Sequence, residues 1–219
     1  MNQVQITHQK TELTLLKEKG LWISALSSLF IADLHFGKAA HFRKSGIPIP
    51  EPIHSQDLEK LDFLIRKYQP SDIYFLGDLF HSDWNDQWGI LMDFFQQFSV
   101  IHFHLIQGNH DILPKSVYAS SPIKVHQQPI HLGDFTLSHE PLEEILPNQL
   151  NICGHIHPGV RLRGLARQSL RIPCFYWDQN QLILPAFGNF TGLAIMNKTP
   201  TSKIFGVTEK KVIPILSEF

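Results

Sequence analysis

The sequence contains few cysteines, no long apolar run and almost no net charge. Cys153 and Cys174 are its only cysteines, which argues against a disulfide-rich secreted scaffold and leads us to expect two free thiols in a reducing compartment. No apolar stretch approaches the ~20 residues that a membrane-spanning helix needs, so we expect no membrane association. A formal net charge of −1 at pH 7 gives no general basic field that would attract nucleic acid.

Internal repeats and low-complexity segments are also missing, and the first 20 residues are too polar for a secretory signal. We therefore expect a cytoplasmic protein. A hydrophobic content of 43% with 18% charged residues is typical of a folded globular chain and argues against disorder. The 219 residues contain no convincing linker, so we expect one domain over residues 1–219 with a sizeable core.

Apolar periodicity in the first half of the chain predicts alternating strands and helices. Strands are expected within 21–33 and over 72–78 and 100–108, with helices over 53–68 and 88–98. After residue 120, short apolar runs separated by turn residues predict a strand-rich second half. This order favours an α/β protein in which two packed sheets carry helices on the outside.

Histidine is unusually frequent, with 13 residues, and several lie just after predicted strands. His155 and His157 are separated by one residue in "CGHIHPG", so their side chains can converge on one point only if the backbone turns. Other polar residues of metal-binding type follow the other predicted strands: Asp33 with His35, Asp78, Asn109 with His110 and Asp111, and His139. Binding crevices form at the carboxyl ends of strands in open α/β sheets, so these residues are candidates for one shared site.

This candidate set combines carboxylate, amide and imidazole ligands. Such a mixture suits manganese, iron or zinc better than calcium or magnesium, which prefer oxygen ligands alone. Seven ligands are too many for one closed structural site, but they fit two adjacent metal ions that share a carboxylate. A Cys153 thiolate would favour zinc, although an inert buried thiol is the interpretation we favour for this residue.

The motif series D-x-H, G-D, G-N-H-D, H and G-H-x-H, over residues 33–157, resembles that of the calcineurin-like metallophosphoesterase superfamily. Over roughly residues 30–195 the chain is similar to the bacterial ligase-associated DNA-damage-response phosphoesterases, in "ADLHFGKAAHFRKSGIPIP", "GDLFHS", "GHIHPGVRL", "RIPCFYW" and "LPAFGNFTG". An endonuclease role is assigned to those proteins, which are encoded beside a DNA ligase and a helicase. The resemblance implies a four-layer α/β/β/α sandwich of two mixed sheets, DNA as the substrate, and a functional association with a DNA ligase and a helicase.

The resemblance also implies how the ligands divide between two divalent ions, with Mn²⁺ expected and iron or zinc as alternatives. One ion would be held by Asp33, His35 and His157, the other by Asn109, His139 and His155, and Asp78 would bridge them. Two ions ~3.5–4 Å apart can clamp the attacking and departing oxygens of a phosphoryl transfer, and a bridging hydroxide is the expected nucleophile.

His110 and Asp111 are the candidate catalytic side chains. In the superfamily that the motifs resemble, the position of His110 stabilises the transition state and can protonate the leaving oxygen. Asp111 either orients the His110 ring and raises its pKa, which would favour acid catalysis near neutral pH, or caps a turn. The sequence leaves both roles for Asp111 open.

Basic residues after the first and last motifs are candidates for binding substrate phosphates. They are Lys38 and Arg43 after the first motif, and Arg161 and Arg163 after the last. Solvated loop charge is the alternative for each of them. Four aromatic residues near the motifs either stack bases or pack in the core: Phe36, Phe42, Phe80 and Trp84.

Three functions remain to be compared. The favoured one is a manganese-dependent phosphodiesterase that acts on DNA, as an endonuclease in repair. A phosphatase or phosphodiesterase for a small nucleotide or another phosphoester is the alternative, favoured by the near-zero net charge and the short chain. A non-catalytic interaction module would have lost ligands, whereas all seven and His110 are present here.

Overall fold

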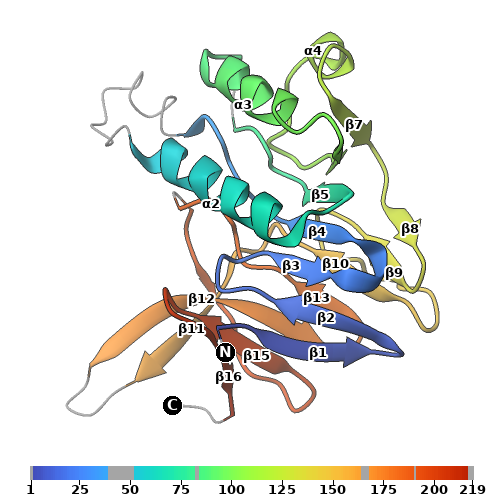
Figure 1. The fold of residues 1–219 in the computed structure, drawn as a ribbon. Helices are drawn as coiled ribbons and strands as arrows, with labels where there is room; N and C mark the ends of the chain where they lie inside the picture. The colour runs from blue at the N-terminus through green and yellow to red at the C-terminus, as the bar shows by residue number, and fades with distance from the viewer. Residues whose placement is uncertain (1, 39–51, 82–83, 164–167, 190, 217–219) are drawn as a thin grey trace.

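Two mixed β-sheets pack face to face in the computed structural model, which describes residues 2–38, 52–81, 84–163, 168–189 and 191–216 (Figure 1). The first sheet has seven strands, in the spatial order β1 (Val4–His8), β2 (Thr11–Leu15), β3 (Leu21–Ile23), β4 (Ser28–Ile31), β5 (Asp72–Leu76), β6 (His102–Ile106) and β7 (Ile123–His126). The pairs from β1 to β4 are antiparallel, and a short 3-10 helix, η1 (Ser24–Leu26), separates β3 from β4. The pairs from β4 to β7 are parallel, so the carboxyl ends of these four strands lie at one edge.

The second sheet has nine strands. Seven follow one another in the order β14 (Ala194–Ile195), β11 (Pro158–Arg163), β12 (Ser169–Asp178), β13 (Gln181–Ile183), β10 (Leu150–Cys153), β9 (Phe135–Leu137) and β8 (Ile130–Leu132). The other two are β15 (Lys203–Val207), which pairs with β12, and β16 (Val212–Ile215), which pairs with β15. Strand β10 runs parallel to both β9 and β13. In Figure 1, β11 and β12 project away from the rest of this sheet.

Helices α2 (Pro52–Tyr68), α3 (Gln87–Gln96) and α4 (Lys115–Ala119) cover the outer face of the first sheet. Strand β5 shows how the layers divide, because its side chains alternate between two cores. Ile73 and Phe75 pack against the helices, whereas Tyr74 and Leu76 pack between the sheets. Among the described residues, no helix is long and apolar enough to span a membrane. The sandwich of two mixed sheets is the one that the resemblance of the motifs implied, and the described helices lie outside the first sheet.

The outer face of the second sheet has its own small core, which includes both cysteines. In the described part of the chain this face is covered by the segment after β14 and carries no helix. Met196 packs against this core, and the Tyr176 hydroxyl donates a hydrogen bond to the Asn197 carbonyl oxygen at 3.3 Å. Both thiols are free and buried, and burial raises the pKa of Cys174 to about 12. Burial also raises the pKa of Cys153, which makes it an inert thiol.

Candidate metal centre

Five segments that each follow a strand come together at the shared edge of the two sheets. They carry Asp33 and His35 after β4, Asp78 after β5, Asn109 and His110 after β6, His139 after β9, and His155 and His157 after β10. Hydrogen bonds donated by backbone N–H groups tie these segments to one another. The Asp33 N–H donates to the Gly77 carbonyl oxygen at 3.2 Å, and the His155 N–H donates to the Asp33 carboxylate at 2.9 Å.

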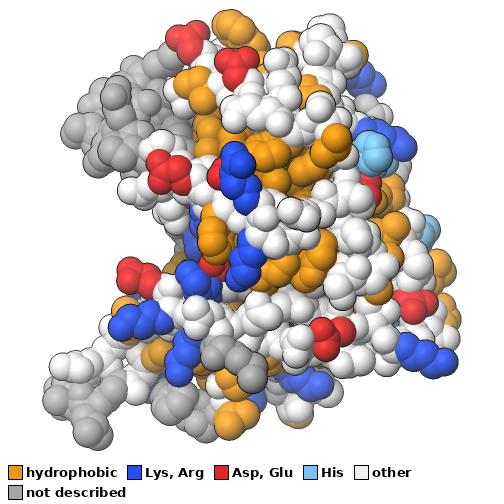
Figure 2. All heavy atoms as spheres, in the orientation of Figure 1, with side chains coloured by type: hydrophobic (Ala, Val, Ile, Leu, Met, Phe, Trp, Pro, Cys, Tyr) orange, Lys and Arg blue, Asp and Glu red, His pale blue; other side chains and the backbone are white. Residues whose placement is uncertain are grey.

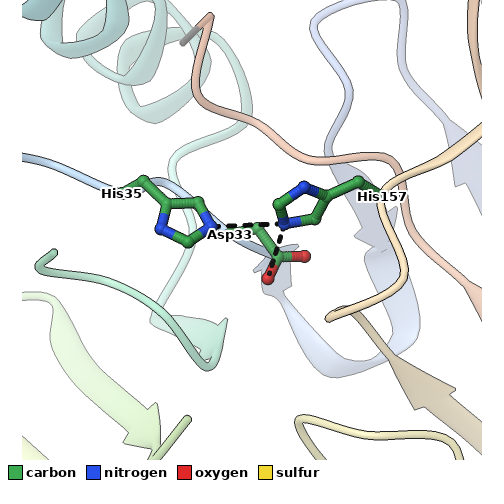
Figure 3. A group of neighbouring side chains, drawn as sticks. All are labelled: Asp33, His35 and His157. Atoms are coloured by element: carbon green, nitrogen blue, oxygen red, sulfur yellow. Dashed lines mark hydrogen bonds and ion pairs between the residues drawn. The ribbon is translucent and has the colours of Figure 1, made fainter. Parts of the chain in front are cut away.

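Asp33, His35 and His157 form the first group of candidate ligands, and their donor atoms lie within 4.8 Å of one another. The rings of His35 and His157 meet from opposite sides above the Asp33 carboxylate (Figure 3). His35 Nε2 lies 3.2 Å from His157 Nε2, which lies 3.4 Å from Asp33 Oδ1. Asp33 is 0% exposed. A buried carboxylate and two converging imidazoles form a site that could hold a cation.

The second group contains Asp78, His139 and His155, again with donor atoms within 4.8 Å of one another. His155 Nδ1 lies 3.1 Å from His139 Nε2, and the Asn109 carboxamide oxygen lies 3.0 Å from the same nitrogen. His139 Nδ1 is 3.0 Å from the Leu76 carbonyl oxygen. Because Nδ1 donates its proton there, Nε2 keeps its lone pair, which is the tautomer a metal ligand needs.

Asp78, a member of the second group, also approaches the first. Its Oδ2 is 3.6 Å from His35 Nε2 in the first group, and its Oδ1 is 3.6 Å from His139 Nε2 in the second. The carboxylate is buried, so it meets the two groups and no bulk solvent. One carboxylate with an oxygen toward each group is an arrangement that suits two adjacent cations.

The electrostatics of the centre favour neutral imidazole at His35. Burial, reinforced by Lys38 and by the neighbouring histidines, lowers the pKa of His35 to about 2. Burial also lowers the pKa of Lys38, against the opposing effect of the Asp78 carboxylate. A neutral ring offers the lone pair that a divalent ion binds. The carboxylate and imidazole donors of both groups therefore fit a divalent transition metal.

Most of the candidate ligands have a left-handed backbone, which non-glycine residues rarely adopt. The φ angles are 53° at Asp33, 48° at His35, 50° at Asp78, 67° at His155 and 52° at His157. At the last two positions this conformation provides the turn that the His-x-His spacing requires. Such strain persists when the surrounding structure holds it, and it concentrates at functional sites.

Comparison with known families identifies the fold and its site. The model of the calcineurin-like phosphoesterase family matches residues 26–168, more than half of the 219-residue chain. The chain belongs to the calcineurin-like phosphoesterase family. Membership, together with the two candidate metal groups, makes it a metal-dependent hydrolase.

Two solved structures are similar to this phosphoesterase. The Pseudomonas putida nuclease MPE matches with a TM-score of 0.78 and 28% sequence identity, over 98% of this chain and 100% of that one. YfcE, a phosphoesterase from E. coli, matches with a TM-score of 0.45 and 14% identity, over 85% of this chain and 96% of the other. Among curated proteins, none matches the chain.

His110 lies beside the first metal group of the phosphoesterase. Its backbone N–H donates to Asp78 Oδ1 at 2.9 Å. Its ring centroid is 5.4 Å from that of His35 and 4.3 Å from that of His81. His81 in turn places Nδ1 3.1 Å from His35 Nδ1. The ring of His110 therefore borders the candidate metal site without belonging to either ligand group.

Asp111 organises the loops of the centre. Its buried carboxylate accepts hydrogen bonds from the backbone N–H groups of Asp78 at 2.8 Å, Gly108 at 2.9 Å and Phe80 at 3.1 Å. Burial raises its pKa to about 7, although the three N–H donors favour the charged form. Within the described part of the chain, this carboxylate makes no hydrogen bond to the His110 ring. The geometry matches the turn-capping alternative.

The structure separates the basic candidates. Lys38 lies next to the centre, where its charge acts on both His35 and Asp78. Arg161 and Arg163 are exposed on β11, the strand that begins one residue after His157. Arg43 lies outside the described residues.

The aromatic candidates separate in the same way. Phe36 and Phe80 are buried in the core between the helices and the first sheet, so neither can stack on a base. Trp84 is 59% exposed, so its ring can stack on a base. Phe42 lies outside the described residues.

A cluster of charged residues that the sequence did not predict supports the segment next to the first metal group. Its members are Lys19, Asp57 and Lys60. The segment after β13 donates hydrogen bonds from Phe187 N–H to the Ala32 carbonyl oxygen at 2.8 Å and from Gly188 N–H to the Asp33 carbonyl oxygen at 3.2 Å. Lys60 Nζ lies 2.6 Å from the Phe187 carbonyl oxygen and 3.2 Å from Asp57 Oδ1.

The same cluster also contacts Asn189 and includes Lys19. Asp57 Oδ2 accepts a hydrogen bond from the Asn189 N–H at 3.2 Å, and Lys19 Nζ donates to the Phe187 carbonyl oxygen at 3.3 Å. Asp57 and Lys60 lie three residues apart on α2, and charges on the inner side of an otherwise amphipathic helix are the sequence signal that could have identified them.

Proposed function

We propose that this phosphoesterase is a two-metal phosphodiesterase that cleaves DNA as an endonuclease in repair. The observation that carries the proposal is the Asp78 carboxylate, which directs one oxygen toward each candidate metal group. Similarity to a nuclease at 28% identity over 98% of the chain supports nucleic acid as the substrate.

We assign Asp33, His35 and His157 to one ion, Asn109, His139 and His155 to the other, and Asp78 to both. The mixed nitrogen and oxygen donors favour Mn²⁺, with iron or zinc as alternatives. When bound, the two ions would activate a bridging hydroxide as nucleophile and polarise the phosphoryl oxygens.

The remaining steps belong to side chains of the protein. His110, at the border of the first group, donates a ring proton to the leaving sugar oxygen. Asp111 fixes the loops that carry Asp78 and Asn109, so we treat it as a positioning residue. Lys38 binds an oxygen of the scissile phosphate at the metal centre. Arg161 and Arg163 of β11 bind other phosphates of the same DNA strand. Arg43 is a further candidate for phosphate binding.

A phosphatase or phosphodiesterase for small nucleotides is the second candidate function. On the face that Figure 2 shows, basic side chains are interspersed with acidic ones, in keeping with a net charge of −1. A protein that tracks a DNA backbone more often has a single basic surface. This observation favours a small substrate.

The cellular setting follows from the resemblance of the motifs to ligase-associated phosphoesterases. We infer a cytoplasmic enzyme that acts in repair alongside a DNA ligase and a helicase.

The manganese-loaded protein should be assayed on plasmid DNA, on single strands and on a panel of nucleotides, each with and without a chelator. The proposal predicts chelator-sensitive DNA cleavage, and binding that weakens steeply with salt because phosphate contacts release counterions. Hydrolysis of nucleotides alone, with DNA left intact, would establish the second function instead.

A further inference from the structure

A cavity of about 380 Å³ adjoins the second metal group. Three segments line it: residues 106–109 at the end of β6, residues 127–129 between β7 and β8, and residues 138–140 and 142 after β9. Asn109 and His139 belong both to the wall of this cavity and to the proposed metal centre. Residues 127–129 also connect the first sheet to the second, so the cavity lies where the chain crosses between the sheets.

The chemistry of the lining does not suit a phosphate. No lysine or arginine is among the described residues that line the cavity, and Glu140 adds an exposed carboxylate. Gln127 and Gln128 are exposed and have no hydrogen-bond partner within the described part of the chain. Pro129 and Leu142 supply apolar surface. Unpaired amide groups beside apolar side chains suit a flat, uncharged, hydrogen-bonding ring such as a nucleobase.

We propose that this cavity, the Asn109 pocket, binds the nucleoside attached to the scissile phosphate. The inference rests on the proposed function, and it specifies how the DNA strand is oriented across the two metal groups. Lys38 and the arginines of β11 lie on the side of the first metal group, where β11 follows His157 directly. The Asn109 pocket lies on the side of the second group. The phosphates of a bound strand therefore extend along β11, and the nucleoside beyond the scissile phosphate enters the pocket.

Three nitrophenyl esters that share a leaving group test this inference. Two are thymidine carrying a 4-nitrophenyl phosphate, as the 3′ and as the 5′ ester, and the third is bis(4-nitrophenyl) phosphate, which has no nucleoside. The measured quantity is the ratio of kcat/KM for each thymidine ester to kcat/KM for bis(4-nitrophenyl) phosphate. Removing both amides, in Gln127→Ala with Gln128→Ala, should lower this ratio about three- to tenfold for at least one isomer, mainly through KM.

Gln128→Trp, which fills the pocket, should lower the ratio at least as much. The matched control is Gln56→Ala with Gln96→Ala, which removes two exposed glutamines on α2 and α3 and should leave the ratio unchanged. An unchanged ratio in both pocket variants would overturn the assignment of the pocket. If the manganese-loaded wild-type protein hydrolysed none of the three esters, the proposed function would fail, and the role of the pocket with it.

Discussion

His155 shows how the backbone at a candidate ligand differs from ordinary turns. Its φ of 67° lies in the left-handed region, and four other proposed ligands share this conformation. Holding an L-residue there costs about 1 kcal/mol or more, so the histidines and aspartates stand at positions whose backbone conformation favours glycine. The residue types and their position after strands were predictable from sequence. The torsion angles were not, because they depend on how five separate segments dock together.

The first prediction concerns this strain. In metal-free protein, His155→Gly should be more stable than His155→Ala by about 1 kcal/mol, because only glycine adopts this φ freely. Urea unfolding with a chelator present measures the difference. Gly89 is the matched control, since a methyl group there meets no atom within 4 Å and its helix favours alanine. Gly89→Ala should therefore stabilise the protein. A more stable His155→Ala variant would contradict the strain argument.

The second prediction concerns proton transfer by His110. A sugar oxygen must be protonated as it departs, whereas a nitrophenolate leaves readily without a proton. His110→Ala should keep both metal ions, lose about 10²–10⁴-fold in DNA cleavage, and lose much less activity on a nitrophenyl phosphodiester. Equal losses on both substrates would mean that His110 stabilises charge on phosphoryl oxygens. A fall in metal content would make it a ligand.

At the scale of elements, the sequence predicted those with strong periodicity. Strands β4, β5 and β6 and helices α2 and α3 lie where alternation or helical spacing indicated them. The hairpin of β1 and β2 was not predicted, because its turn at Gln9 lacks the glycine or asparagine that usually identifies a hairpin. Helix α4 is only 5 residues long, too short to leave a periodic pattern. The charges of Asp57 and Lys60 on the inner side of α2 could have been noticed in the sequence, but their contacts with Phe187 and Asn189 could not, because these depend on tertiary packing.

The third prediction concerns the paired strands β11 and β12. Arg161 lies directly opposite Arg171 in this pair, and like charges placed so are unfavourable unless an anion joins them. Arg161→Ala with Arg163→Ala should raise KM for DNA more than it lowers kcat and should reduce the salt dependence of binding. Arg66→Ala, which removes an arginine paired with Asp62 on α2, is the control. Unchanged kinetics would mean that the β11 arginines are solvated surface charges that do not contact DNA.

The fourth prediction concerns Lys19 in the cluster of charged residues next to the first metal group. Burial, with a contribution from Lys60, lowers its pKa from 10.5 to about 8. Between these two pH values the unfolded chain binds more protons than the folded one, so stability should rise with pH across this window. The rise should reach about 3 kcal/mol at most. Unfolding measured from pH 8 to 10.5 should show this slope in the wild-type protein and a flatter one in Lys19→Met. An equal slope in both proteins would contradict a lowered pKa at Lys19.

At the scale of the whole molecule, the proposed centre joins the two sheets. Each candidate metal group takes ligands from segments of both: Asp33 and Asp78 follow strands of the first sheet, and His139, His155 and His157 follow strands of the second. Metal binding therefore depends on how the sheets dock, and bound metal should stabilise that docking by mass action. The large core between the sheets provides the rigid support.

Metal content of the Asp78→Asn variant tests the central claim most directly. We predict that the wild-type protein binds two Mn²⁺ ions per chain, and that Asp78→Asn loses both at concentrations that saturate the wild type, together with DNA cleavage. Asp93→Asn, which alters an exposed aspartate on α3, should bind two ions and remain active. If Asp78→Asn retained one ion at wild-type affinity, Asp78 would not be shared, and the two-metal account would be wrong.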